Sequence, residues 1–407
     1  MNVGILTHCI AVNYGANLQA LSTASFLKSH GYTPIFLLWS EYISTASYIS
    51  SIKKEQLEMH RNFLSNCGFM VTDDCKSDDD FVRTVVNNHI ELLIVGSDAV
   101  LTVQSFYDRF YFSKTGLHIR KIPQDYRFPN PFWIPFYDKL PNGCTAVLMS
   151  PSCQSSNYNL LLRKTKKRMK QYLRNFHYLS ARDTYTQTII SSLVEVDLAK
   201  VPVTPDPVFA FNDNVDSSLI PTKQFIQSKF GLPSNYIVVS FYEVPDSIWM
   251  NELKESAHVN NLYVVQLPMP QDSKEGGGDC KLDLPLNSLE WYSLIKNSKG
   301  YIGNNMHPII VCIHNGVPFF SIDQHGKRTF FDLYYSSKSS KVYDLLSRLD
   351  FLEYRVSYNE YKRARPSDIL SRMMHFEYEK CKEKSTMMKN KYFEMMYGIL
   401  QKKRRCA

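Results

Sequence analysis

The residues with the clearest chemical potential lie in two segments about three hundred residues apart, Asn13–Ala20 and Asn304–Pro308. Each segment follows a short apolar run and precedes a helical pattern, so each is expected at a strand-to-helix junction. Residues just past the carboxyl ends of parallel strands face the crevice where open α/β sheets bind ligands, and helix N-termini there attract anions. The two segments together predict one site between two domains, with an anionic substrate.

His307 is the strongest single candidate for chemistry, because it lies at the second junction, directly before the apolar stretch 309–313. A histidine in that position can exchange a proton near neutral pH. The alternative is a histidine that caps the helix or fills the core.

Two cationic side chains are candidates for binding an anion. Arg182 begins an expected helix after a strand, and its planar fork of donors suits a carboxylate or a phosphate. An ion pair with Asp183 or another nearby carboxylate is the alternative. Lys327 follows the expected strand 319–322 and adds positive charge at the same sheet edge, unless it is a solvated surface residue.

Several familiar site types are disfavoured by spacing. Asn13-Tyr14-Gly15 has neither the dinucleotide fingerprint nor a phosphate loop, and predicts only a turn that permits close backbone approach. Gly96-Ser97-Asp98 lacks the glycine-flanked elbow of serine hydrolases, and helix capping explains its polar residues. The spacing of His307, His314 and His325 does not place three ligands on one face, so no metal is expected.

The length and net charge of the chain limit the classes of protein to which it can belong. At 407 residues the chain is too long for one ordinary core and predicts two domains. The net charge of +8 could indicate nucleic acid, but Lys and Arg are spread along the chain without a nucleic-acid-binding signature. We therefore expect no nucleic-acid partner and a generic anionic one instead.

The cellular location is predicted from cysteines and apolar runs. Nine cysteines show no pair at the two-residue spacing of zinc or redox sites, which is typical of a reducing cytosol. No signal peptide or membrane-spanning run is evident, so a cytoplasmic protein is expected. The basic stretch Lys402–Arg405 could contact anionic lipid at the inner face of the membrane, or could be a solvated tail.

The alternation of apolar runs and helical patterns predicts an α/β fold with two Rossmann-like domains. The first domain is expected to span 1–211 and the second 212–355, with the boundary where Asn, Asp and Pro cluster at 212–233. The charged segment 356–407 has a long helical pattern and is expected to pack back on the first domain. A basic helix is expected at about 158–174.

The ordered motifs resemble the polysaccharide pyruvyl transferase family from residue 2 to about residue 350. The similar segments are Asn13–Ala20 (N-Y-G-A-x-L-Q-A), Ile94–Asp98, Asn130–Trp133, Ser180–Asp183 (S-V-R-E), Pro205-Asp206-Pro207, Tyr301–Pro308 (T-D-S-F-H-G) and Asn315–Pro318. The chain departs from the family pattern at Asn305, at Pro308 in place of Gly, and at Ser152-Cys153-Gln154 in place of Ser-Phe-Gly.

The resemblance implies a GT-B-like arrangement of the two domains, with the active site in the interdomain cleft. It also implies transfer of the enolpyruvyl unit of phosphoenolpyruvate onto two sugar hydroxyls as a cyclic ketal, without a cofactor beyond this donor substrate. His307 matches the family's active-site histidine, and Arg182 its arginine for the donor's carboxylate or phosphate. The expected substrate-binding positions are Asn13, Tyr14, Gly15, Asn17, Ser97, Asp98, Asn305, Lys327 and Lys341.

The expected acceptor is a hexose of a bacterial surface polysaccharide, capsule or exopolysaccharide, which could be lipid-linked. Two alternatives stay open. A GT-B glycosyltransferase using a nucleotide sugar would have the same architecture, because fold alone does not separate the two activities. A non-catalytic saccharide-binding protein is the other, since Asn305 and Pro308 flank the key histidine.

Overall fold

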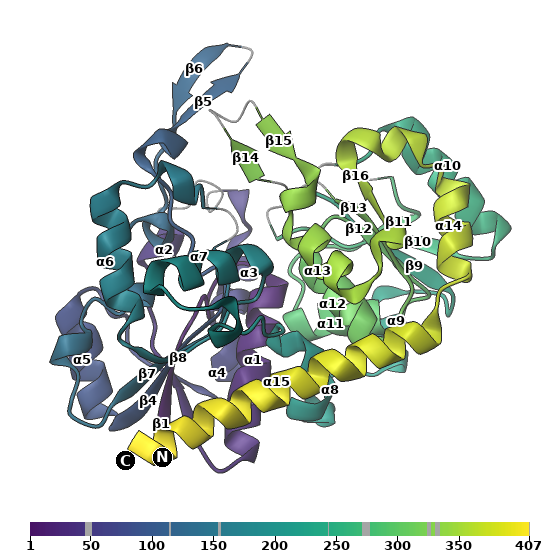
Figure 1. Ribbon diagram of the computed structural model, residues 1–407. Coiled ribbons are helices and arrows are strands. Elements are labelled where there is room, and N and C mark those ends of the chain that lie inside the picture. Colours follow the sequence, from purple (N-terminus) through teal and green to yellow (C-terminus); the bar gives the residue numbers. More distant parts are fainter. Residues whose placement is uncertain are drawn as a thin grey trace.

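The computed structural model describes residues 1–44, 51–113, 115–153, 156–242, 244–270, 277–323, 327–329 and 334–406. Of residues 327–329, 334–337 and 402–406 only the backbone is described. The chain forms two halves, each built on a six-stranded sheet whose strands are all parallel (Figure 1). The elements lie in the order expected for two Rossmann-like units.

The first sheet has the strand order β3-β2-β1-β4-β7-β8. Its strands are apolar along nearly their whole length because helices cover both faces. They are β1 (Asn2–Leu6), β2 (Thr33–Phe36), β3 (Met70–Val71), β4 (Ile90–Asp98), β7 (Thr145–Pro151) and β8 (Phe176–Leu179). The helices of this half are α1 (Tyr14–Ser29), α2 (Glu41–Ser44), α3 (Lys54–Arg61), α4 (Phe63–Asn66), α5 (Asp78–Asn87), α6 (Arg163–Leu173) and α7 (Thr184–Val194).

The long connection between β4 and β7 carries an outward-projecting hairpin. A 3-10 turn, η2 (Phe106–Arg109), leads into β5 (Phe110–Ser113) and β6 (Gly116–Ile119), which pair antiparallel. Figure 1 shows this hairpin standing away from the rest of the molecule. The expected helix at 158–174 begins later, at Arg163, because Leu162 has an extended backbone that separates α6 from a short turn over Tyr158–Leu160.

The second sheet has the strand order β11-β10-β9-β12-β13-β16. Its strands are β9 (Tyr236–Ser240), β10 (Tyr263–Gln266), β11 (Cys280–Lys281), β12 (Tyr301–Gly303), β13 (Phe319–Asp323) and β16 (Arg355–Ser357). A separate pair consists of β14 (Lys327–Thr329) and β15 (Tyr334–Ser336). The helices are α8 (Phe211–Asn214), α9 (Lys223–Phe230), α10 (Ser247–Val259), α11 (Ser288–Lys296), α12 (Met306–Asn315), α13 (Lys341–Leu349) and α14 (Pro366–Met374).

The last helix, α15 (Tyr378–Cys406), crosses both halves (Figure 1). The thiol of Cys381 donates to the carbonyl of Ile313 in the second half, and the hydroxyl of Ser150 in the first half donates to the sulfur of Met395. The helix therefore ties the two halves together. The domain boundaries after residues 211 and 355 stay predictions.

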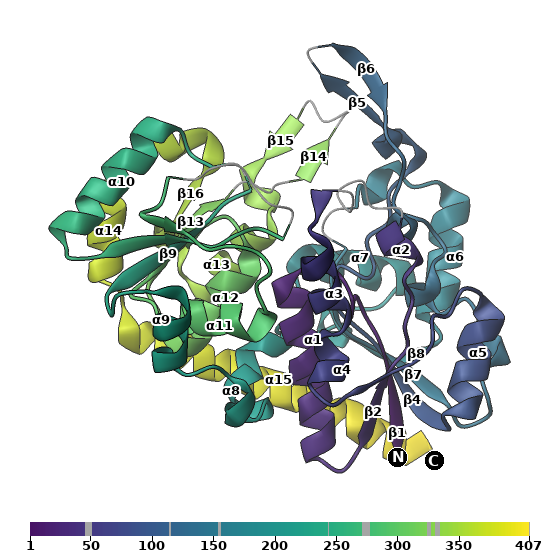
Figure 2. The same ribbon diagram turned by 180° about the vertical axis from the view of Figure 1, so that it is seen from behind.

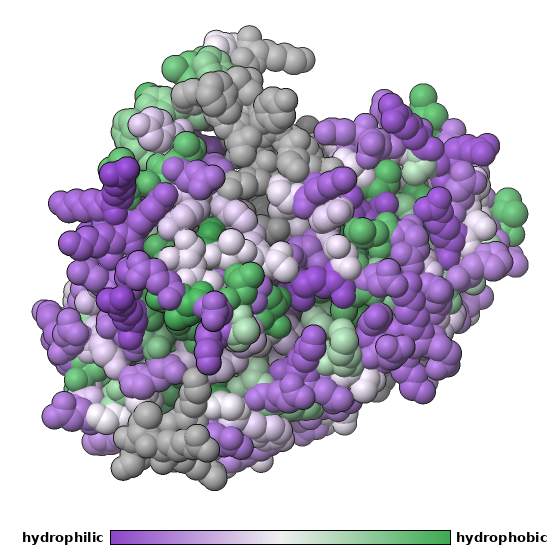
Figure 3. Space-filling view, in the orientation of Figure 1, coloured by the Kyte–Doolittle hydropathy of each residue, from purple (hydrophilic) through white to green (hydrophobic). Residues whose placement is uncertain are grey.

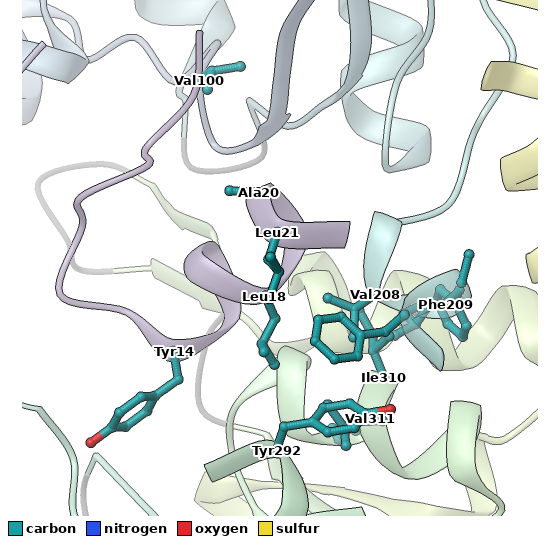
Figure 4. Close-up of a cluster of buried hydrophobic side chains, with 14 of the residues drawn as sticks. Tyr14, Leu18, Ala20, Leu21, Val100, Val208, Phe209, Tyr292, Ile310 and Val311 are labelled. Atoms are coloured by element: carbon teal, nitrogen blue, oxygen red, sulfur yellow. The ribbon is translucent and has the colours of Figure 1, made fainter. Parts of the chain in front are cut away.

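An apolar cluster joins the two halves beneath the site. Leu18 and Leu21 of α1 pack with Val208 and Phe209 of η8 (Pro207–Ala210), and with Ile310 of α12 (Figure 4). Figure 2 shows α1 at the boundary, next to α11 and α12. These side chains are fully or almost fully removed from water, so the halves share one continuous core. Their relative position is thereby fixed by burial of apolar surface.

Candidate active site

Titratable side chains gather where strands of the first sheet end. His8 follows β1, Asp98 ends β4, Arg182 follows β8, and Asp206 is the N-cap of η8. His307 joins them from the second half, in the first turn of α12. Since the carboxyl ends of parallel strands meet at one edge of a sheet, residues distant in sequence converge here.

Arg182 lies between two carboxylates. Its Nη1 is 2.9 Å from Oδ2 of Asp206, and its Nη2 is 3.3 Å from Oδ1 of Asp98. The same oxygen of Asp206 is 3.4 Å from Nε2 of His307. On the other side, Nδ1 of His8 is 3.9 Å from Asp98 and its Nε2 is 3.3 Å from Asp125. Acidic and basic groups thus alternate from Asp125 to His307.

Burial and mutual charge set the pKa values along this line. Burial alone would raise the pKa of Asp98, but the charges of Arg182, His8, His307 and Lys341 hold it well below its usual range. Burial also opposes the ionised form of Asp206, yet the close contact and charge interaction with His307, together with the charge of Arg182, lower its pKa. Burial would lower the pKa of Arg182, and its carboxylate neighbours raise it instead. Both carboxylates are therefore held ionised beside a permanent cation.

Gly15 allows His307 to reach this position. The second residue of α1 is so close to the histidine that a Cβ on Gly15 would lie 2.1 Å from its Cγ and 2.2 Å from its Nδ1. The turn is held by Asn13, whose side chain accepts hydrogen bonds from the backbone N–H groups of Gly15 and Ala16. The close approach expected of Asn13-Tyr14-Gly15 is thus an approach to the histidine of the other half.

Two pockets are formed by both halves; His307 lines the first, and its neighbour Asp206 lines the second. The first, of about 440 Å³ including its open mouth, is lined by His307, Asn13, Asn305 and the aromatic rings of Tyr242 and Trp291. The second, a narrow pocket of about 300 Å³ including its open mouth, is rich in charge. Its polar lining consists of Arg182, Asp183, Asp206, Lys341, Asp344 and Arg348.

Lys341 is the cation of the charged pocket that is least neutralised. Burial, and then the charge of Arg182, lower the pKa of its ammonium group. Within the described residues no salt bridge involves Lys341, whereas Arg348 pairs with Asp344 at 2.8 Å and donates to the carbonyl of Arg182. An incoming anion would relieve the mutual repulsion of Lys341 and Arg182.

The structure places the other expected site residues as follows. Asn13, Tyr14, Gly15 and Asn305 line the pocket of 440 Å³. Lys327 lies in β14, and its side chain is outside the described residues.

Two of the expected substrate-binding side chains are used inside the protein. The amide of Asn17 is fully buried, donates to Ser288 of the second half and lies 3.0 Å from Nδ1 of His60. The hydroxyl of Ser97 donates to the carbonyl of Ser150. Neither residue lines the two pockets, so these contacts favour a structural role for both.

Arg182 makes ion pairs, as the alternative interpretation expected, but not with the neighbour suggested for it. Asp183 instead caps α7 by accepting from the N–H of Thr186, and it accepts a second bond from the hydroxyl of Ser152. The partners of Arg182 come from other strand ends, 84 and 24 residues away. The partners of such an ion pair are therefore determined by which residues meet at the edge of the sheet, and not by nearness in the sequence.

Sequence reasoning did not assign His8, Asp125 and Asp206 to the site. His8 and Asp206 carry the same signal that selected Arg182, a polar residue just after an expected strand. Asp125 carries no such signal, because it lies in the Pro-rich connection between β4 and β7. Among the described residues no cluster of three or more His, Cys, Asp or Glu is placed to hold a metal ion.

A model of the polysaccharide pyruvyl transferase family matches residues 13–326, which include Asp98, Arg182, Asp206 and His307. The chain belongs to the polysaccharide pyruvyl transferase family. This confirms the resemblance read from the motifs and supports a transferase of polysaccharide biosynthesis. A search of curated proteins found no match.

Solved structures resemble the fold over its whole length. UDP-GlcNAc 2-epimerase from Neisseria meningitidis, bound to UDP-GlcNAc, has a TM-score of 0.55 at 10% identity, and the likeness covers 99% of this chain and 100% of that one. The S. aureus MnaA–UDP structure has a TM-score of 0.49 at 9% identity, covering 96% and 92%. The glycosyltransferase SnogD from Streptomyces nogalater has 0.46 at 10% identity, covering 100% and 99%. The predicted fold class, two Rossmann-like units in a GT-B-like arrangement, is confirmed.

Proposed function

We propose that this family member transfers the enolpyruvyl unit of phosphoenolpyruvate onto two hydroxyls of a sugar, giving a cyclic pyruvate ketal in a bacterial surface polysaccharide. One observation carries the proposal: His307 lines a pocket of amides and aromatic rings and contacts Asp206, which lines the cation-containing pocket. The cation-containing pocket suits a small anionic donor, and the pocket of amides and aromatic rings suits a sugar. A proton-transferring group between donor and acceptor is what the reaction needs.

The donor is proposed to bind beside Lys341 and Arg182. Both terminal nitrogens of Arg182 already carry carboxylate partners, so a donor anion must share this guanidinium with Asp98 and Asp206. Lys341 has no such competitor among the described residues and is proposed to make the stronger new contact.

The acceptor is proposed to bind in the pocket of 440 Å³. Trp291 and Tyr242 offer aromatic faces for the apolar face of a hexose, while Asn13 and Asn305 offer amide groups for its hydroxyls. Asn305 is not fully buried, and its amide contacts the sulfur of Met269, an interaction weak enough to be exchanged for a sugar hydroxyl.

In the proposed chemistry, protonated His307 assists transfer of a proton to the donor's methylene carbon, and one acceptor hydroxyl adds to the central carbon. The bond from that carbon to the phosphate oxygen then breaks, and the second hydroxyl closes the ketal. Each hydroxyl loses its proton, of which one ends on the new methyl group and the other leaves with phosphate. Asp206, held ionised by Arg182, orients and stabilises the imidazolium between these steps.

His307→Ala is the first variant to measure. We expect phosphate release from phosphoenolpyruvate with acceptor to fall by about 10²–10⁴, the usual contribution of a general acid or base. His258→Ala on α10, which removes an exposed histidine paired with Asp279, is the matched control. A His307→Ala variant with a near-normal rate would sink the assignment.

Arg182→Ala is a poorer first test. The structure shows that it would leave Asp98 and Asp206 buried without their cation, a change that typically costs about 3–5 kcal/mol. Loss of activity in this variant would therefore not separate catalysis from folding.

The substrate class is tested by incubating the protein with phosphoenolpyruvate and a panel of simple and lipid-linked hexosides, while following phosphate release and product mass. A product heavier by one dehydrated pyruvate supports the proposal. Thermal stabilisation by UDP-sugars, with no response to phosphoenolpyruvate, would favour the glycosyltransferase instead. Sugar binding that survives His307→Ala without any transfer would favour a saccharide-binding protein. The proposed location is the cytoplasm, at the inner face of the membrane.

A further inference from the structure

Exposed apolar side chains concentrate on one projecting part of the molecule. We call them the apolar crest: Phe106, Tyr107, Phe112, Leu117, Ile119 and Leu162. Five come from the hairpin and the turn at its base, and Leu162 comes from the start of α6. Each is about half exposed or more, with Leu162 at 67% and Ile119 at 64%. Figure 3 shows the crest as hydrophobic surface on the outermost end of the molecule. Exposed apolar groups gathered in this way mark an interaction surface.

A basic helix flanks the crest. Residues 163–173, which form α6, contain six Lys or Arg and no Asp or Glu. Lys170 pairs with Glu195, whereas within the described residues no salt bridge involves Arg163, Lys164 or Lys167. The surface over α6 in Figure 3 is correspondingly hydrophilic. The apolar crest and the basic helix α6 are together complementary to a surface that carries anionic groups over an apolar interior.

The crest and the helix form one surface. A groove of about 680 Å³ lies between them and is lined by Phe106, Tyr107, Leu162 and Thr165. Beside it the amide of Asn157 donates to a carboxylate oxygen of Asp108 at 2.7 Å, joining the segment before α6 to the turn at the hairpin's base.

Cations lie over aromatic rings around the crest. Arg109 lies 5.6 Å from the ring centre of Phe106, Arg120 lies 5.6 Å from that of Tyr111, and Lys166 lies 4.3 Å from that of Tyr158. Side chains with an apolar body and a polar tip favour the boundary between lipid headgroups and acyl chains. The local chemistry therefore fits a bilayer better than a second copy of this chain, whose own α6 would bring like charges together.

All crest residues except Leu162 belong to the same connection as part of the candidate site. That connection follows Asp98, contains the hairpin, and includes Asp125, which contacts His8. Figure 1 shows the hairpin and the end of α15 at opposite ends of the molecule. The side chains of Lys402–Arg405, from which membrane contact was expected, are outside the described residues, and that contact stays a prediction.

We propose that the apolar crest and the basic face of α6 dock on an anionic lipid bilayer, holding the cleft near a membrane-borne acceptor. The placement of the cleft near a membrane-borne acceptor rests on the proposed function, whereas the docking on lipid does not. No helix in the described part of the chain could cross a bilayer, so the contact is peripheral.

Flotation with vesicles tests the docking without any turnover. Vesicles of phosphatidylcholine alone are compared with vesicles that also contain phosphatidylglycerol. We expect binding to the anionic vesicles that weakens as ionic strength rises. Lys164→Gln with Lys167→Gln should weaken binding by about 25-fold, because each cation near an anionic surface contributes about fivefold. Leu117→Ser with Ile119→Ser should weaken it by about tenfold or more.

Matched double variants elsewhere control for general loss of charge or apolar surface. Lys299→Gln with Lys382→Gln, and Ile248→Ser with Val259→Ser on α10, should leave vesicle binding unchanged. All four double variants should release phosphate normally with a soluble acceptor. The docking proposal is overturned if the wild-type chain does not bind anionic vesicles, if all four variants bind equally, or if the crest variants instead convert a dimer into a monomer. Docking without any transfer activity would overturn the proposed function alone.

Discussion

Gly15→Ala is the most informative single substitution, because it adds one methyl group at the contact between the two halves. The new Cβ would lie 2.1 Å from Cγ and 2.6 Å from Cβ of His307. Carbon atoms in contact normally stay about 3.5–4.0 Å apart, so the histidine must retreat by roughly 1.5 Å or the halves must separate. Either movement takes Nε2 of His307 away from Asp206.

The effect on rate should exceed the effect on stability. A misplacement of about 1 Å can cost about 100-fold in rate, equivalent to about 2.7 kcal/mol in the activation free energy. Alanine in a helix gains about 0.5–1 kcal/mol over glycine, which partly offsets an overpacking cost of about 1–3 kcal/mol. We therefore expect phosphate release to fall about 100-fold while the free energy of unfolding falls by about 1–2 kcal/mol.

The assay is kcat for phosphate release, measured beside urea unfolding. Gly398→Ala on α15 is the control, since a Cβ there meets nothing within 4 Å; it should keep full activity. Gly15→Ala should also cost little further stability in a His307→Gly background, because both the clashing ring and the clashing Cβ are gone. A Gly15→Ala variant within twofold of the wild-type rate, or one that is equally harmful without the histidine, would refute the reasoning.

Three further predictions concern the charged pocket, the acid stability and the contact between the halves. Lys341→Gln should raise KM for phosphoenolpyruvate by about tenfold or more with a smaller change in kcat, whereas the exposed Lys338→Gln should not; equal KM values would contradict the donor pocket. The pKa of Asp98 in the folded protein lies below its unfolded value of about 3.9, so the ionised carboxylate stabilises the fold above about pH 3.9, and this stabilisation is lost as the pH falls towards the folded pKa. Asp98→Asn should therefore flatten the fall of the urea midpoint between about pH 5 and pH 3. An unchanged slope of midpoint against pH would contradict this role of Asp98. Gln56 is fully buried and exchanges two hydrogen bonds with the backbone of Leu286 in the other half. Gln56→Ala should therefore lower the free energy of unfolding by about 2 kcal/mol. Gln224→Ala, at an exposed position, is the control, and equal losses of stability in the two variants would contradict a role of Gln56 in joining the halves.

Local patterns in the sequence were sufficient to predict most of the fold. The strand expected at 319–322 occurs as β13, which ends one residue later, and α12 begins within the strand-to-helix junction expected at 304–308. These elements have short apolar runs bounded by polar residues, and such signals depend only on near neighbours. The start of α6 was missed because the break at Leu162 is a backbone conformation that its apolar and basic neighbours do not reveal.

Side-chain function was harder to predict than position. Asn17 lies in a motif segment, yet its amide is buried against Ser288 because that face of α1 meets the second half. Ser97 points to the neighbouring strand and bonds the carbonyl of Ser150. In both cases the deciding partner is more than 50 residues away. Residue type and local spacing carry no information about such a partner.

The sequence by itself determined that two parallel α/β units form and that Arg182 and His307 stand at strand-to-helix junctions, because periodicity and turn chemistry are local. Only the tertiary structure decided the partners: Arg182 pairs with Asp98 and Asp206, and His307 packs against Gly15. Those contacts depend on which strands neighbour each other and on how the shared apolar core orients the two halves. Both are consequences of burying apolar surface over the whole chain, which no short segment encodes.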